Sequence, residues 1–336
     1  MTPGPTVPTV APMETTARTA VVAVGGNALL EGGGPATIAE QFAAARRLAV
    51  QLTRLVVDGW RIVLTHGNGP QVGFILRRSD LVSEIEPELP KLALDMCVAD
   101  SQGSLGYILG ATLQSELRAA GLAQQVVAML THTIVDGDDP AFAAPSKPIG
   151  SFYDEDAASE LAEAHGWVVT EDSGRGWRRL VPSPQPARIV EQDAIETLVD
   201  GGFLVVAAGG GGIPVVEEPD GRLRGVEAVI DKDFASALLA TAIGADLLCI
   251  TTGVDQVAIN FGRPDQRALD VVSIDEARRH LADGQFPAGS MGPKVEAALR
   301  YLEAGGGEVL ITNPDRLAEA LGGGTGTRIV ATATAV

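Results

Sequence analysis

The chain has 336 residues, of which 46% are hydrophobic, and its 43 acidic against 25 basic side chains give a formal net charge of −18. This length and apolar content fit one large α/β domain or two smaller ones, while the negative charge makes nucleic acid and anionic membrane surfaces poor partners. Two distant cysteines and the lack of an apolar run of roughly 20 residues argue against a disulfide-stabilised secreted domain and a membrane-spanning helix, and they favour a cytoplasmic protein.

The predicted elements begin after a tail rich in proline and threonine. Residues 1–18 have neither the basic start nor the apolar core of a secretion signal, so we expect them to form a flexible tail. Residues 21–24 predict a strand, residues 41–58 have the apolar spacing of a helix, and residues 61–65 predict a second strand. Glycine clusters end both strands, which is typical of a parallel βαβ unit.

The later elements continue this alternation around one insertion. Residues 136–186 contain six prolines and two of the three tryptophans, and we interpret them as a small protruding subdomain. Elsewhere the pattern predicts helices over residues 98–120, 189–200, 233–243 and from residue 293, and strands over residues 125–130, 203–208, 246–251 and 308–312. The predicted fold class is therefore α/β, with an open, mainly parallel sheet and helices on both of its faces.

Three glycine-rich turns directly follow predicted strands: Gly25-Gly26-Asn27, Gly67-Asn68-Gly69 and residues 209–212. Glycines at such places leave backbone N–H groups open to an anion, and the following helix adds the positive end of its dipole. A tight turn without a ligand explains any one of these clusters alone. Because ligands of open α/β sheets bind at the carboxyl ends of the strands, the three turns together favour one shared phosphate site.

These turns do not match the common nucleotide-binding motifs. The Walker A pattern G-x-x-x-x-G-K-[ST] and the dinucleotide pattern G-x-G-x-x-G are both missing there, which disfavours a P-loop ATPase and a nicotinamide dehydrogenase. His66 lies beside the second turn, and a structural imidazole is the favoured interpretation. The remaining histidines and the cysteines show no zinc-ligand spacing.

Lysine is scarce in this chain, which contains only Lys91, Lys147, Lys232 and Lys294. Lys232 lies between two aspartates at a predicted helix start, and Lys294 follows Pro293 in the first turn of another helix. An aspartate at a helix start is most often only a cap, and a lysine between two acids can be a solvated ion pair. Taken singly, each of these positions is therefore explained by a structural role. Two of four lysines at such helix starts instead favour contacts with phosphate, and phosphoryl transfer needs compact positive charge around the moving group.

Nine segments of the sequence resemble carbamate kinases, which belong to the amino acid kinase superfamily. In chain order they are VVAVGGNALL, HGNGPQVG, SQGSLGYILG, SKPIG, DSGRGWRRLVPSP, GGGGIPVV, GVEAVIDKDFASALLA, TTGVDQVAINFG and GSMGPKVEAAL. The GGN and IDKD segments are typical of the whole superfamily, whereas SKPIG and GRGWR followed by VPSP are similar to carbamate kinases in particular. The resemblance runs from about residue 21 to residue 330, and it leaves carbamate-kinase-like carbamoyl phosphate synthetases as an alternative.

The resemblance implies a fold, a reaction and an assembly. The fold is a three-layer αβα sandwich, the amino acid kinase fold, spanning residues 19–336, with residues 136–186 as the protruding subdomain. Its N-terminal part would bind carbamate or carbamoyl phosphate, and its C-terminal part would bind ATP or ADP. The reaction is reversible phosphoryl transfer from ATP to carbamate with Mg²⁺ accompanying the nucleotide, and the assembly is a homodimer.

The resemblance also assigns site residues and names no metal-ligating side chain. It places Gly25, Gly26, Asn27, Gly67, Asn68, Gly69, Gly210 and Gly211 around the transferring phosphoryl group and the carbamate. The implied catalytic set is Lys232 and Lys294, organised by Asp233, with Lys147 reaching over from the protruding subdomain. The implied nucleotide contacts are Asp231, Thr252, Gly253, Val254, Asp255 and Met291.

Two positions stand apart within the resemblance. Other kinases of the superfamily carry a lysine at the position of Ala23, whereas carbamate kinases, like this chain, do not. Lys232 or Lys147 must therefore supply that positive charge. Gly292 stands where the family more often has a bulky apolar residue, and we expect it to loosen the turn before Lys294.

Two other functions remain open at this point. One is a related kinase that phosphorylates another small acid, such as an acylglutamate or a phosphonate. The other is a module that senses a nucleotide or carbamoyl phosphate without chemistry, which the presence of all the implied lysines and Asp233 disfavours. Within the family, the resemblance suggests use towards ATP synthesis in arginine breakdown through the deiminase pathway.

Overall fold

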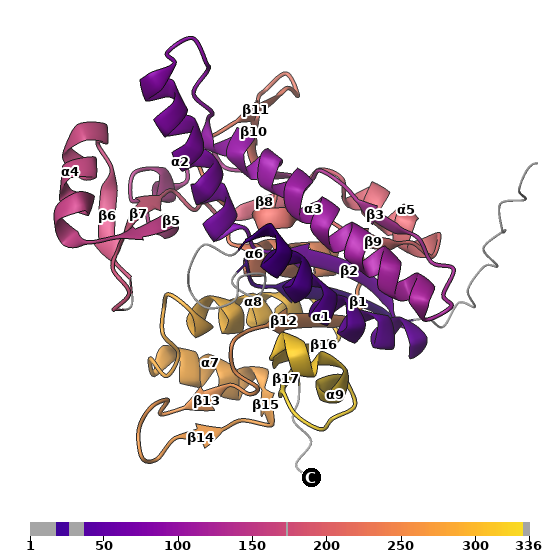
Figure 1. Cartoon of the computed structure of the whole chain (residues 1–336). Coiled ribbons are helices and arrows are strands. Elements are labelled where there is room, and N and C mark those ends of the chain that lie inside the picture. The colour runs from indigo at the N-terminus through magenta and orange to yellow at the C-terminus, as the bar shows by residue number, and fades with distance from the viewer. Residues whose placement is uncertain (1–17, 27–36, 173, 332–336) are drawn as a thin grey trace, which may run out of the picture.

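The computed structural model describes residues 18–26, 37–172 and 174–331 of the chain (Figure 1). The predicted flexible tail lies outside the described residues except for Arg18, and so does the predicted phosphate-binding residue Asn27. Within the described part, no helix is long and apolar enough to cross a membrane.

The centre of the molecule is a mainly parallel sheet. Along the described chain its strands follow the spatial order β15-β17-β16-β12-β1-β2-β9-β3, in which only β16 and β17 pair antiparallel. The strands are β1 (Thr19–Val24), β2 (Arg61–His66), β3 (Val126–Ala128), β9 (Leu204–Val206), β12 (Leu247–Thr251), β15 (Val271–Ser273), β16 (Glu308–Thr312) and β17 (Thr327–Val330). Both predicted strands of the first βαβ unit are therefore neighbours at the middle of the sheet.

Helices cover both faces of this sheet, as the alternation of side chains along β1 requires. Val21 and Ala23 pack against α5 (Gln192–Asp200), α6 (Lys232–Ala242) and α8 (Met291–Glu303), whereas Val22 faces α1 (Ile38–Val57) and α3 (Leu94–Ala119). Every residue of β1 is buried, which is typical of a parallel strand covered on two sides. The predicted α/β class and the three-layer αβα sandwich are confirmed.

Several predicted boundaries move for local reasons. Helix α1 starts at Ile38 instead of residue 41, because Thr37 and Glu40 form a reciprocal capping box. Helix α5 starts at Gln192 instead of residue 189, because residues 186–189 form a strand. The helix α2 (Gly69–Ile85) was not predicted, since its apolar residues follow the helical period only weakly, although Pro70 in its first turn is a typical start signal.

Two smaller sheets flank the main one. A mixed sheet in the order β11-β10-β4-β8 lies next to the third glycine turn, and an antiparallel sheet in the order β5-β7-β6 falls within residues 136–186 together with α4. Figure 1 shows β5, β6, β7 and α4 beside α2, set apart from the central layers. The bounds are β4 (His132–Val135), β5 (Lys147–Tyr153), α4 (Glu155–His165), β6 (Val168–Glu171), β7 (Trp177–Val181), β8 (Pro186–Ile189), β10 (Ile213–Glu217) and β11 (Leu223–Gly225).

The remaining elements complete the C-terminal half. The two-stranded ribbon of β13 (Ala258–Ile259) and β14 (Arg267–Ala268) precedes α7 (Ile274–Ala282), and α9 (Leu317–Leu321) packs on the α1 side. Short 3₁₀ turns occur at Pro140–Phe142, Gly209–Gly211 and Pro314–Arg316.

Candidate active site

The first two glycine turns touch each other at the carboxyl ends of β1 and β2. A Cβ atom on Gly67 would lie 2.7 Å from the backbone nitrogen of Gly26, and one on Gly26 would lie 3.1 Å from the carbonyl carbon of Gly67. The Gly67 N–H also donates to the Val24 carbonyl at 2.8 Å, which extends the sheet pairing by one residue. The two turns pack backbone against backbone, so a side chain at either position would force them apart.

The third glycine turn lies against the second. A Cβ on Gly210, whose φ is +67°, would lie 2.1 Å from Nδ2 of Asn68, and one on Gly211 would lie 2.7 Å from the carbonyl oxygen of Ile230. Ile230 directly precedes Asp231, so this turn also borders the start of α6. Added Cβ atoms on Gly25 and Gly69 would meet nothing within 4 Å, so these two glycines border open space.

Buried polar side chains of α3 hold the turns in place, and sequence reasoning did not name them. The Gln102 amide donates to the carbonyl oxygens of Thr131 and Gly209, at 3.1 and 2.8 Å, and accepts from the Thr131 N–H at 2.9 Å. Asn68 donates to the Ser101 hydroxyl at 2.7 Å. Neither residue carries a local sign of this role, because other polar residues lie beside them along α3.

His66 supports the same turns as a neutral, buried ring. It is 1% exposed, its Nδ1 lies 3.1 Å from the Gly67 carbonyl oxygen, and its Nε2 would lie 2.5 Å from a Cβ on Gly209. Burial lowers the pKa of His66 to about 4, although its hydrogen bond to Gly67 opposes the shift. The structural role favoured from the sequence agrees with this environment.

Two lysines meet on one buried aspartate beside these turns. The Lys232 ammonium contacts Oδ1 of Asp233, and the Lys294 ammonium lies 3.1 Å from its Oδ2. Asp233 is 3% exposed, and the Lys232 and Lys294 side chains are 11% and 16% exposed. A Cβ on Gly67 would also lie 3.3 Å from Cδ of Lys232, which puts this lysine directly alongside the second turn.

The charges of the two lysines fix the state of Asp233. Burial by itself would raise the pKa of this carboxyl, but the charges of Lys232 and Lys294 and their hydrogen bonds outweigh burial and hold the pKa well below its usual range. Burial lowers the pKa of Lys232, and the Asp233 charge opposes that shift. Asp233 therefore stays ionised at neutral pH and keeps both ammonium groups oriented.

Lys147 reaches this cluster from the sheet of β5, β7 and β6, which we call the protruding sheet. It is the first residue of β5, and its ammonium contacts Oδ2 of Asp231. Asp231 is the N-cap of α6, because its Oδ1 accepts the Asp233 N–H at 2.8 Å. The three lysines and the two aspartates together leave one net positive charge, which suits a phosphate ligand.

The predicted nucleotide-binding residues lie further along the same sheet edge. Thr252 follows β12, the parallel neighbour of β1, and its N–H donates to the Thr312 carbonyl at 2.8 Å. The Asp255 carboxylate lies 2.5 Å from the Arg316 guanidinium. Gly253 and Val254 lie between Thr252 and Asp255 in the chain. These contacts attach the segment from Thr252 to Asp255 to the β16 side of the site. Asp231 lies instead at the lysine cluster.

The start of α8 brings Met291 and Lys294 to the site on one turn. Met291 is the first residue of α8 and packs partly on the core, three residues before Lys294. The expected loosening of this turn by Gly292 is wrong. The Gly292 N–H donates to the Pro287 carbonyl at 2.9 Å, and an added Cβ would lie 3.1 Å from that oxygen, so the turn is closely packed.

No group of three or more His, Cys, Asp or Glu side chains is arranged for a metal ion within the described ranges. The carboxylates nearest the lysines are already engaged, Asp233 by two ammonium groups and Asp231 by Lys147 and a backbone N–H. Such a site can contribute positive charge and N–H donors to a phosphate that brings its own cation.

The fold and this cluster define a class of protein. The chain matches the sequence model of the amino acid kinase family over residues 18–313, and it belongs to that family. It is 49% identical over 311 residues to the carbamate kinase of Thermococcus kodakarensis, covering 92% of this chain and 98% of that protein. It is also 48% identical over 313 residues to a carbamate kinase-like protein of Escherichia coli, covering 93% of this chain and 98% of that protein.

Solved structures agree with the sequence comparisons. The carbamate kinase from Giardia lamblia bound to AMP-PNP superimposes with a TM-score of 0.85 at 40% identity, covering 94% of this chain and 99% of that one. Similarity at this level over nearly the full length of both proteins puts the chain in the carbamate kinase branch of the amino acid kinase family. The resemblance drawn from the nine sequence segments is confirmed.

Proposed function

We propose that this chain transfers a phosphoryl group reversibly between ATP and carbamate, forming ADP and carbamoyl phosphate. The observation that carries the proposal is the buried Asp233 carboxylate with Lys232 and Lys294 on its two oxygens, located where three glycine turns meet. The named carbamate kinases among its relatives support the choice of carbamate as the acceptor.

The arrangement suits the transition state of phosphoryl transfer. An oxygen of carbamate attacks the γ-phosphorus of ATP while the bond from that phosphorus to the bridging oxygen of ADP breaks, and the reverse reaction follows the same path. Little covalent chemistry is needed from the protein, which must align the two oxygens and stabilise the charge on the moving group. Lys232 and Lys294 supply that charge, the glycine turns supply N–H donors, and Asp233 keeps the lysines oriented.

We assign the two substrates to opposite sides of the lysine cluster. The three glycine turns would hold carbamate and the transferred phosphoryl group. Gly26 and Gly67 abut at the ends of β1 and β2, and Gly25 and Gly69 border open space beside them. The segment from Thr252 to Asp255, with Met291, would hold the nucleotide. Mg²⁺ would arrive on the nucleotide phosphates as part of that substrate, because the aspartates at the lysine cluster already have partners.

We further propose a homodimer that makes ATP in the cytoplasm during arginine breakdown. Met96 and Tyr107 of α3 are 50% and 66% exposed, and we expect the part of α3 that carries them to contact the second copy. Cys97 and Cys249 are free and buried, which suits a reducing compartment. Light scattering of the purified protein tests the dimer.

The activity is tested in the direction of ATP synthesis. Purified protein given ADP, Mg²⁺ and carbamoyl phosphate is expected to form ATP well above a reaction without protein. The same preparation is expected to ignore acylglutamates and phosphonates in an assay of ADP release from ATP. Absence of ATP formation, or faster phosphorylation of another acid, would contradict the proposal and favour a related small-acid kinase.

A further inference from the structure

The protruding sheet touches the body of the molecule closely at one joint. A Cβ on Gly73 of α2 would lie 1.9 Å from Cα of Gly150 in β5, so the two backbones are in direct contact. Gly150 has a φ of +75°, a backbone conformation that residues with a side chain rarely adopt. Lys147 precedes this joint by three residues on the same strand, so the docking of β5 on α2 sets where Lys147 lies.

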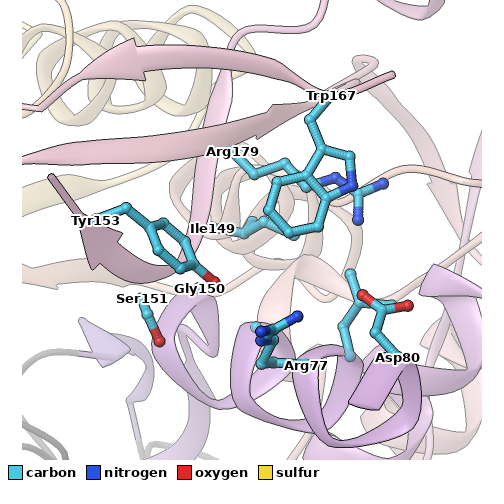
Figure 2. A pocket seen from close by; sticks show the side chains of 10 residues that line it. Arg77, Asp80, Ile149, Gly150, Ser151, Tyr153, Trp167 and Arg179 are labelled. Carbon is cyan, nitrogen blue, oxygen red and sulfur yellow. The ribbon is translucent and has the colours of Figure 1, made fainter. Parts of the chain in front are cut away.

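A pocket that opens to solvent lies beside this joint. Figure 2 shows a pocket with Arg77 and Asp80 of α2 on one side and Tyr153 and Trp167 of the protruding subdomain on the other. Its volume is about 280 Å³, including its mouth to solvent. Solvent therefore reaches this side of the joint. Lys147 lies three residues before Gly150, so a second contact is expected to hold its side chain in register with the site.

Asp231 provides that second attachment. One of its oxygens caps α6 by accepting the Asp233 N–H at 2.8 Å, and the other contacts the Lys147 ammonium. A single carboxylate therefore links the helix that carries Lys232 and Asp233 to the sheet that carries Lys147. The Asp231 side chain is 11% exposed and that of Lys147 is 37% exposed, so the pair remains accessible to solvent on the lysine side.

We propose that Asp231 is a positioning residue, which holds Lys147 of the protruding sheet over the phosphoryl-transfer site. A lysine ammonium has three donors, so one bond to Asp231 leaves two for the transferred phosphoryl group. This role differs from the nucleotide contact that the sequence resemblance implied for Asp231. The activity test of this inference rests on the proposed function, whereas the exchange test described below does not.

The variant D231N separates the two roles of the carboxylate. Asparagine is as good an N-cap as aspartate, so the start of α6 and the fold are retained while the charge facing Lys147 is lost. K147A removes the same pair from the other side and leaves the cap untouched. D154N is the matched control, because Asp154 caps α4 in the protruding subdomain, where its side chain accepts the Ala157 N–H at 2.8 Å.

The expected result is a shared loss in kcat. D231N and K147A are each expected to lower kcat about tenfold or more with the KM for ADP unchanged, since both remove the charged contact that positions one ammonium. The double variant is expected to be no worse than K147A alone, because the two changes break one interaction. D154N keeps the wild-type kcat. Independent, multiplying losses, or a raised KM for ADP with unchanged kcat in D231N, would overturn the proposal.

Amide hydrogen exchange of β5 in the protein without substrates gives a readout that needs no activity. Residues 147–153 are expected to exchange faster in D231N and in K147A than in the wild type, and at the wild-type rate in D154N. Unchanged exchange in both charge variants would overturn the positioning role even when the enzyme makes ATP. Faster exchange in a protein that makes no ATP would support the Asp231–Lys147 attachment and reject only the proposed reaction.

Discussion

The lysines of the candidate site come from two regions that hold them differently. Lys232 and Lys294 belong to α6 and α8 of the central sandwich, where their side chains are 11% and 16% exposed and share the buried Asp233. Lys147 belongs to the protruding sheet, where its side chain is 37% exposed and its ammonium pairs with Asp231. In the core, burial and the shared Asp233 together orient two ammonium groups. In the protruding sheet, a single ion pair with Asp231 must orient the ammonium of Lys147.

Physical chemistry explains why the two arrangements respond differently to change. Removing one member of a buried, hydrogen-bonded charge cluster leaves the others without compensation, which costs several kcal/mol. A partly exposed pair contributes about 1 kcal/mol or less to folding, because water competes for both partners. Changes in the core cluster are therefore expected to have larger effects than changes in the protruding sheet.

The largest effect is expected from the core lysines. K294A and K232A are each expected to lower kcat about 10²–10³-fold, because each removes a fixed positive charge at the moving phosphoryl group. ATP formation from ADP and carbamoyl phosphate measures the loss. K91A is the matched control, since the Lys91 side chain is 57% exposed and pairs with Asp80, and its kcat is expected to stay within about twofold of wild type. Equal kcat values in all three variants would contradict the assignment.

A smaller effect is expected from acid, acting through His66 in the core turns. The folded pKa of His66 is about 4, below its ordinary value of 6.5. The stability that the neutral His66 contributes is fully present above the pKa of histidine in the unfolded chain. It is lost as the pH falls through the pKa of His66 in the folded protein, because the unfolded chain binds the proton first. The free energy of unfolding is expected to drop by up to about 3 kcal/mol over that interval from this group.

Urea unfolding at several pH values measures that drop. H66N is the comparison, because its amide can replace the contact with the Gly67 carbonyl but does not titrate. The wild type is expected to lose more stability than H66N between about pH 7 and about pH 4. Parallel pH profiles of the two proteins would show that His66 does not titrate in this way.

The smallest effect is expected at the joint of the protruding sheet. G73A is expected to push β5 away from α2 and to lower kcat about tenfold by misplacing Lys147, while the central sandwich still unfolds at a similar urea concentration. G110A is the matched helical control, because its Cβ would lie 3.8 Å from the nearest atom of Ala128. It is expected to gain roughly 0.5–1 kcal/mol of stability with unchanged kcat. Unchanged activity in G73A would contradict the importance of the joint.

Much of the central fold could be predicted from local sequence. The valine-rich β1 and the apolar spacing of α1 are strong periodic signals, and the strand over residues 308–312 was predicted with its observed bounds. Helix α2 was not predicted, because packing against α3 and β5 stabilises it more than its own weak apolar period does. The strand over residues 203–208 proved to be Leu204–Val206, since Ala208 adopts a φ of +49° to enter the third glycine turn.

The candidate site divides along the same line. Glycine at a strand end and a lysine at a helix start are local features, so the sequence could nominate Gly67, Gly210, Lys232 and Lys294. Gln102 carries no local sign of its role, because its three hydrogen bonds reach residues 29 and 107 positions away. The nucleotide assignments of Thr252 and Asp255 stay predictions.

The sequence by itself determined that this chain is an α/β protein of the carbamate kinase type, because periodicity, glycine turns and the nine motif segments are all readable along the chain. Only the tertiary structure decided that Asp233 is shared by two lysines and that Lys147 pairs with Asp231. These contacts join residues 61 and 84 positions apart. The physical reason is that an ion pair depends on distance in space, which chain packing sets and local pattern does not.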